Sequence, residues 1–160
     1  AIGKNSRSDY NAIITIGRDR VTGVIYVIDA WAEKIPMHKA LQVALRKIKQ
    51  WKPKVFGVET VQAQFDMFRQ LREKCIQEGI YSTRILAVNP KGKKEERVEA
   101  LEPLVEGGYI RFNKGHRLLL EQMELFPAHD NDDLPDALAS AVEIAGKQRK
   151  RTYYQKPRGF

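Results

Sequence analysis

The sequence has little cysteine and no long hydrophobic run. Cys75 is the only cysteine among the 160 residues, which excludes an internal disulfide and a cysteine-based zinc cage. No apolar run approaches the roughly 18 residues that a membrane-spanning helix needs. No signal-peptide pattern is present either, so we expect neither membrane insertion nor secretion, and no membrane among the partners.

Several well-known catalytic motifs are also missing. Neither a Walker loop (GxxxxGK[ST]) nor GxGxxG occurs, so a nucleotide-driven motor and a dinucleotide-binding role find no support in these residues. The nucleophile motif GxSxG is absent as well, and no Cys–His pair stands out. Any chemistry must therefore come from other groups, of which carboxylates are the most conspicuous.

Acidic residues are outnumbered by basic ones, although they are locally concentrated. The 28 Lys and Arg against 20 Asp and Glu give a net charge of +8 and a pI near 9.6. A polyanion such as nucleic acid is then the first partner to consider. The length and an apolar share of 42% are typical of one globular domain with a proper core.

The hydrophobic pattern predicts a β-β-α-β-α-β-α-β-α-α order. Strands are expected at 10–16 and 24–31, joined as an antiparallel hairpin, and then at 55–58, 82–88 and 109–112. Helices are expected after Pro36, from Phe65 to Gly79, from Glu95 until Pro103 ends or bends the helix, at 118–126, and after residue 133. This order favours an α/β fold with a mixed sheet and helices on both faces.

We expect one domain, 1–146, followed by a basic tail, 147–160. The tail carries Lys and Arg with no acid among them, and two tyrosines lie between the basic residues. Such a segment is either a disordered, solubilising tail or a nucleic-acid-binding one.

An acidic stretch, His129-Asp-Asn-Asp-Asp-Leu-Pro-Asp136, directly precedes an apolar helical run. Asp133 and Asp136 are three residues apart, so on a helix they project from one face. Two carboxylates held that close repel each other unless a cation lies between them, and Mg²⁺ prefers all-oxygen ligands. The alternative is a helix cap, which needs one Asp or two and suits Asp130 and Asp132 better than Asp136.

Glu59 is a second candidate, because it directly follows the hydrophobic strand Val55-Phe-Gly-Val58. Functional groups in α/β folds gather outside the carboxyl ends of strands, although a strand can also simply end in a polar residue. With Asp133 and Asp136, Glu59 would supply carboxylates from separate elements. Two metal ions about 4 Å apart in such a site can activate water and stabilise the leaving oxygen of a phosphodiester.

Lys93, Lys94 and Arg97 lie around the start of the third expected helix, after a basic loop. They could hold phosphates beside the metals, or they could form an ordinary solvated helix start. For the loop histidines, His116 and His129, a surface position is the plain interpretation. For Asp9 it is a turn or strand cap.

Motifs spread over most of the chain resemble one family. They are Gly3-x5-Asp9-Tyr-x-Ala-Ile, Tyr26-Val-Ile-Asp-Ala30, Gly57-Val-Glu59, Lys93-x3-Arg97, Gly108-Tyr-Ile110, Phe126-Pro127 and Asp133-x2-Asp136-Ala-Leu-Ala. The last of these, with the earlier Glu59, resembles the RuvC-like branch of the RNase H fold. The whole chain resembles the carboxyl-terminal nuclease domain of the large terminase subunit of tailed bacteriophages or prophages.

The resemblance implies an RNase H-like fold that binds two Mg²⁺ or Mn²⁺ ions and cuts double-stranded DNA concatemers during genome packaging. It implies that Glu59, Asp133 and Asp136 are metal ligands, that Lys93, Lys94 and Arg97 face DNA, and that Asp9 is a supporting acid. Implied partners are an upstream packaging ATPase domain, the portal and the small terminase subunit. The implied location is the cytoplasm of the infected or lysogenic bacterial host.

One departure from the family pattern matters. The family's first metal-binding Asp lies on a strand that would precede residue 1, and Ala1-Ile2-Gly3 resembles the end of that motif. We therefore expect 1–146 to lack the first strand, and the site to be one carboxylate short.

Two alternatives to a terminase nuclease remain at this point. One is a RuvC-like Holliday junction resolvase, which would act as a dimer on branched DNA. The other is a non-catalytic DNA-binding or packaging-motor docking module, in which the acids merely cap a helix.

Overall fold

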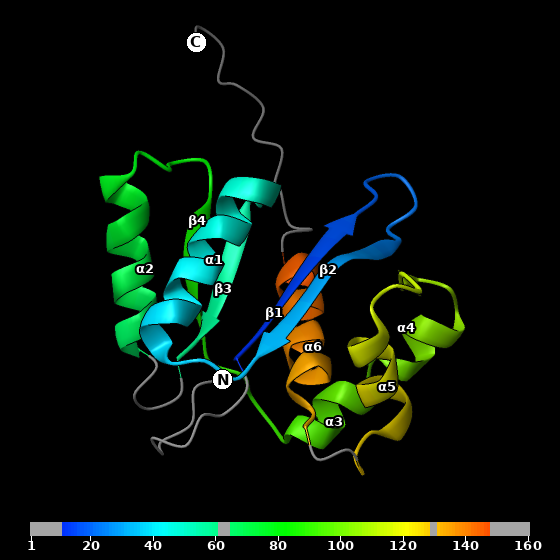
Figure 1. The fold of residues 1–160 in the computed structure, drawn as a ribbon. Coiled ribbons are helices and arrows are strands. Elements are labelled where there is room, and N and C mark those ends of the chain that lie inside the picture. The colour runs from blue at the N-terminus through cyan, green and yellow to red at the C-terminus, as the bar shows by residue number, and fades with distance from the viewer. Residues whose placement is uncertain (1–10, 61–64, 129–130, 148–160) are drawn as a thin grey trace, which may run out of the picture.

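The computed structural model describes residues 11–60, 65–128 and 131–147 (Figure 1). Its elements are β1 (Asn11–Arg18), β2 (Ile25–Glu33), α1 (Met37–Trp51), β3 (Val55–Glu59), α2 (Phe65–Gln77), β4 (Arg84–Val88), α3 (Lys94–Glu99), α4 (Glu102–Glu106), β5 (Ile110–Arg111), α5 (Arg117–Leu125) and α6 (Asp133–Lys147). Every strand predicted from the sequence is present, with ends shifted by at most two residues. None of the helices in the described ranges is long and apolar enough to cross a membrane.

The predicted antiparallel hairpin is confirmed. β1 pairs with β2 from Asn11↔Glu33 to Arg18↔Ile25, with a register shift between Thr15 and Ile16. At the turn, the Asp19 carboxylate accepts hydrogen bonds from the backbone amides of Val21 and Thr22, each at 2.8 Å. The side chain of the turn thus satisfies two backbone donors locally, as Asp does in many turns.

The strands form two hydrogen-bonded groups. β1, β2 and β5 make a mixed three-stranded sheet, with β5 parallel to β2, and β3 and β4 make a parallel pair. In Figure 1, β3 and β1 lie beside each other and point in opposite directions. Within the described ranges, no backbone hydrogen bonds pair β1 with β3. Each of the two groups of strands therefore has an unpaired edge that faces the other group. The predicted strand ahead of residue 1 stays a prediction.

Two hydrophobic cores lie on opposite faces of the strands. The α6 core comprises Ile25, Val27, Val98, Leu101, Ile110, Leu119, Leu134, Leu138 and Ala139. The α1–α2 core comprises Ala44, Ile48, Val58, Leu71 and Cys75. Alternate residues of β1 divide between them: Ile14 and Ile16 pack on the α6 core, and Ile13 on the α1–α2 core. The prediction of helices on both faces is therefore confirmed.

Gly57 lets α6 approach the face of β3 opposite the α1–α2 core. A Cβ at this position would lie 2.4 Å from Cδ1 of Ile144 and 3.0 Å from Cγ2 of Val88. A side chain here would have to displace Ile144, so glycine lets the second half of α6 pack on the middle of β3.

Two details differ from the prediction. The helix expected from Glu95 to Pro103 is two short helices, α3 and α4, because Pro103 lies in the first turn of α4, where its missing N–H costs nothing. The last helix runs to Lys147, the first residue of the expected tail. The rest of the tail, 148–160, lies outside the described residues, as do Asp9, His129, Asp130 and the opening motif as far as Tyr10.

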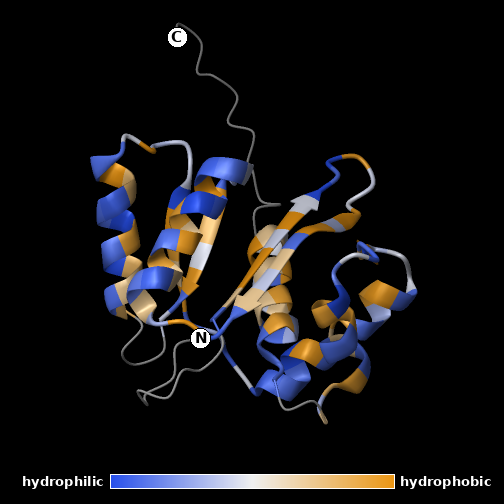
Figure 2. Cartoon of the chain, in the orientation of Figure 1, coloured by the Kyte–Doolittle hydropathy of each residue, from blue (hydrophilic) through white to orange (hydrophobic). Residues whose placement is uncertain are grey.

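Figure 2 shows hydrophobic residues along the strands and α6, whereas α3 is mostly hydrophilic. α3 nevertheless packs against α6. Its charged side chains are therefore brought to the start of α6, where the acidic stretch lies.

Candidate active site

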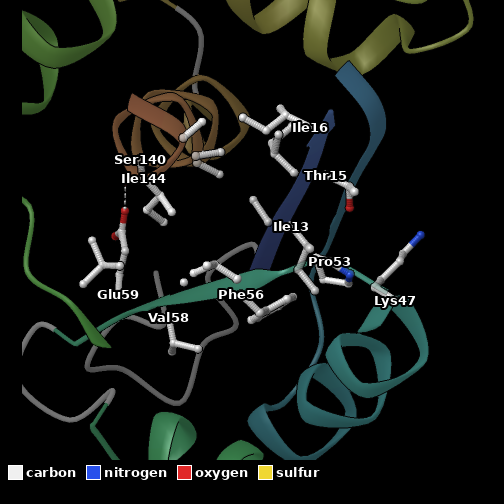
Figure 3. Close-up of a pocket in the computed structure, with 18 of the residues that line it drawn as sticks. Ile13, Thr15, Ile16, Lys47, Pro53, Phe56, Val58, Glu59, Ser140 and Ile144 are labelled. Carbon is white, nitrogen blue, oxygen red and sulfur yellow. Dashed lines mark hydrogen bonds between the residues drawn. The ribbon is translucent and has the colours of Figure 1, made fainter. Parts of the chain in front are cut away.

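A pocket of about 790 Å³ lies between β1 and β3 and is bounded on one side by α6. Its middle is apolar, with Ile13, Phe56 and Ile144 in the lining. Figure 3 shows Glu59 at one end and Lys47 at the opposite end. The predicted acids Glu59, Asp133 and Asp136 all line this pocket. Residues that are far apart in the sequence thus meet around one cavity.

Glu59 is the last residue of β3, where the strand still pairs with Val88 of β4. Its Oε1 accepts a hydrogen bond of 2.8 Å from Oγ of Ser140 on α6. The strand fixes the backbone of Glu59, and this bond fixes one carboxylate oxygen.

Asp136 lies in the first turn of α6, and only 8% of the residue is exposed. Nη2 of Arg97 donates a hydrogen bond to its Oδ1 at 2.5 Å, and Nζ of Lys94 lies 4.0 Å from its Oδ2. The α6 amide of Leu134 is satisfied by Oε1 of Gln122 instead of by an acid. The contacts of the Asp136 carboxylate with Arg97 and Lys94 join α6 to α3, which a helix cap does not do.

Glu59 and Asp136 interact electrostatically. Burial, followed by the negative charge of Glu59, raises the pKa of Asp136, while the positive charges of Arg97 and Lys94 oppose that rise. A bound cation would relieve the unfavourable interaction of the Asp136 carboxylate with the charge of Glu59.

Lys94 belongs to the same charge cluster. Its Nζ donates to Oδ1 of Asp132 at 2.5 Å. Burial alone would lower the pKa of Lys94, but the hydrogen bond to Asp132 and the charges of Asp136, Asp132 and Asp133 outweigh it and raise the pKa. Lys94 therefore stays charged and neutralises part of the acidic cluster.

The three basic residues predicted to face DNA differ in their surroundings. Lys93 is exposed at the N-cap of α3, whereas Lys94 and Arg97 are directed toward the acids. Nε of Arg97 is buried and has no hydrogen-bond partner among the described residues, so one donor of its guanidinium is left for a further acceptor. Their contact with DNA stays a prediction.

Ser140 is the residue that sequence analysis missed. It follows Asp136 by four residues, so helical spacing alone places both on one face of α6. A serine in a run of alanines carries no chemical signal of its own. Only the approach of β3 shows that its hydroxyl meets Glu59.

The donor set suits a hard divalent cation in type, because carboxylate oxygens are the ligands that Mg²⁺ and Mn²⁺ prefer. In the part of the chain that the structure describes, however, no group of three or more His, Cys, Asp or Glu side chains could hold a metal ion. The structure brings Glu59 and Asp136 into electrostatic contact and places Asp133 at the same pocket, without gathering all three into one ligand sphere. The expectation that the site is one carboxylate short stays a prediction.

Comparison with known structures shows the fold. A fowlpox virus resolvase solved with Holliday junction DNA matches with a TM-score of 0.58 and 13% identity, over 90% of this chain and 97% of that chain. The yeast mitochondrial Holliday junction resolvase Ydc2 matches with a TM-score of 0.61 and 14% identity, over 84% of this chain and 72% of that chain. A search of curated protein sequences gave no significant match.

Comparison with protein families gives a more specific result. Residues 2–144 match the model described as the terminase RNaseH-like domain. Both the α/β RNase H-like fold and the terminase resemblance predicted from the sequence are confirmed. This is a nuclease-type domain, and the chain belongs to the terminase RNaseH-like domain family.

Proposed function

We propose that this domain is the metal-dependent endonuclease of a phage DNA-packaging terminase, which cleaves double-stranded concatemeric DNA. One observation carries the proposal: β3 and α6 bring Glu59 and Asp136 to one pocket, where burial and then the charge of Glu59 raise the pKa of Asp136. Such a carboxylate pair is the start of a metal site for phosphodiester hydrolysis.

In this proposal, Glu59, Asp133 and Asp136 are the protein ligands of Mg²⁺ or Mn²⁺. When bound as a pair, the metal ions supply an activated water and stabilise the leaving oxygen. The chain's own cations have two tasks. Lys94 and Arg97 balance the charge of the acids, and the exposed Lys93 offers a donor to DNA phosphates.

The wider setting belongs to the same proposal. A packaging ATPase domain, the portal and the small terminase subunit would be the protein partners, and the cytoplasm of an infected or lysogenic bacterial host would be the location. The family match supports this setting. The net charge of +8 also suits double-stranded DNA as the substrate.

Plasmid nicking tests the proposal. The purified full-length polypeptide that contains these residues should convert supercoiled plasmid to the nicked and linear forms with Mg²⁺ or Mn²⁺ and stop in EDTA. Glu59→Gln and Asp136→Asn should each reduce the rate to background, because each removes a ligand charge with little change in shape. Glu73→Gln, on the exposed side of α2, is the matched control and should retain the rate. Nicking that persists in EDTA, or in both site variants, would exclude the proposal.

A junction resolvase is the second candidate, because the chain shares its fold with two resolvases over most of its length. A four-way DNA junction and a linear duplex of the same sequence distinguish the two. Preferential, symmetric cleavage of the junction by a dimer would favour the resolvase. A non-catalytic docking module would instead show no Mn²⁺ binding tighter than millimolar by calorimetry. This alternative is tested because no group of three metal-binding side chains occurs among the described residues.

A further inference from the structure

Four side chains from three elements form a continuous polar chain at the pocket. Nη1 of Arg97 lies 3.3 Å from Oγ of Ser140, and its Nη2 bonds to Asp136. Oγ of Ser140 lies 2.8 Å from Oε1 of Glu59. Ser140 is buried, with 6% of its surface exposed. One guanidinium therefore reaches both carboxylates, Asp136 directly and Glu59 through a hydroxyl.

The chemistry of these groups fixes the direction of each hydrogen bond. A guanidinium can only donate, so the serine oxygen accepts from Arg97. The hydroxyl has a single proton, and its other partner, an ionised carboxylate, can only accept. The Ser140 proton is therefore directed at Glu59, and the neighbouring positive charge strengthens this bond.

This bond holds together two side chains that otherwise repel each other. Glu59 ends a strand and has a long side chain, whereas Asp136 and Ser140 are fixed to the same face of α6. Without the hydroxyl, repulsion by Asp136 would favour conformations in which the Glu59 carboxylate turns away. With it, Oε1 is held and Oε2 is left for another ligand.

We propose that Ser140 is a positioning residue, which, oriented by Arg97, holds the Glu59 carboxylate beside Asp136 so that the two can bind one divalent cation. This inference rests on the proposed function, since it concerns the cation of that site. It adds a residue and a task that the acidic motifs do not show. Ser140 would not itself contact the DNA or the metal.

Mn²⁺ binding separates this role from a merely structural one. Free Mn²⁺ is measured by electron paramagnetic resonance while the purified protein is titrated without DNA. Ser140→Ala should weaken Mn²⁺ binding about tenfold, the lower end of what loss of a ligand-orienting partner costs. Ser140→Thr keeps the hydroxyl and should restore most of the affinity. Ser82→Ala, an exposed serine before β4, is the control and should bind like the wild type.

Nicking assays give a second, independent measurement. In Ser140→Ala, the Mn²⁺ concentration for half-maximal nicking should rise about tenfold, while the rate at saturating Mn²⁺ changes less. Circular dichroism on every variant verifies folding, and Ser140→Thr keeps the proposal testable if the alanine variant folds poorly.

Each outcome has a defined meaning. Wild-type Mn²⁺ affinity in a folded Ser140→Ala variant would overturn the positioning role and leave the proposed nuclease intact. Equal weakening in Ser140→Thr and Ser140→Ala would also overturn it, because the hydroxyl would then not matter. Wild-type protein that binds no Mn²⁺ tighter than millimolar and does not nick DNA would overturn both proposals.

Discussion

The two cores of this domain are built differently, and the candidate site lies where they meet. The side with the α6 core contains the β1–β2 hairpin, whose turn is stabilised by backbone hydrogen bonds to the Asp19 carboxylate. The side with the α1–α2 core depends on parallel strands, β3 and β4, which need the crossover helix α2. The first side supplies Asp136, Ser140 and the cations of α3, and the second supplies Glu59. The geometry of the site therefore depends on how firmly the two sides are held together.

Polar contacts bridge the two sides at both ends of the pocket. At one end, Ser140 bonds to Glu59. At the other, Nζ of Lys47 on α1 lies 2.6 Å from Oδ2 of Asp29 on β2, and the two side chains are 18% and 22% exposed. Figure 3 shows Lys47 and Glu59 at these opposite ends. The lining between these two ends is apolar.

The largest expected effect comes from opening either core. Leu138 and Leu71 are each fully buried, one in each core, so Leu138→Ala and Leu71→Ala should each lower the free energy of unfolding by about 2–5 kcal/mol. Each side also carries one tryptophan, Trp31 in β2 and Trp51 in α1. Urea unfolding followed in single-tryptophan proteins should give coincident transitions if the two sides unfold together. Separate midpoints would show that the two sides are independent units.

A smaller effect is expected at the Lys47–Asp29 bridge. Lys47→Met leaves a largely buried Asp29 carboxylate without its cation and should cost about 1–2 kcal/mol, between the values for exposed and buried pairs. Lys49→Met is the control, because the bridge from Lys49 to Glu78 is 51% and 39% exposed and should matter by less than about 0.5 kcal/mol. Urea unfolding measures both. Equal losses would mean that the bridge between the two sides has no special role.

The smallest effect concerns the turn of the hairpin. Backbone hydrogen bonds from Thr22 and Val21 lower the pKa of Asp19 below 3.8. Because this folded-state pKa lies below the unfolded value, the contribution of Asp19 to stability is fully present above pH 3.8 and is lost as the pH falls through the lower pKa. An NMR titration of the Asp19 carboxyl carbon should show the lowered pKa, and Asp19→Asn should remove that part of the acid dependence. A titration midpoint of Asp19 at or above pH 3.8 would contradict the hydrogen bonds from the turn to its carboxylate.

The sequence by itself determined the order of the elements and the positions of the acids along them. The hairpin, the helix after Pro36 and the placement of Glu59 at a strand end follow from local periodicity, which each segment carries in its own residues. The shared face of Asp133 and Asp136 follows from helical spacing alone. These features were predictable because each involves residues within a few positions of one another.

The tertiary structure alone decided which side chains meet. The bond between Ser140 and Glu59 joins residues 81 positions apart, and Arg97 reaches Asp136 across 39 positions. The direction of Lys94 and Arg97 toward the acids depends on the packing of α3 against α6. The close approach of α6 to β3 depends on the missing side chain of Gly57. Such distances are set by how the two cores pack, and local periodicity carries no information about packing between segments that are distant in the sequence.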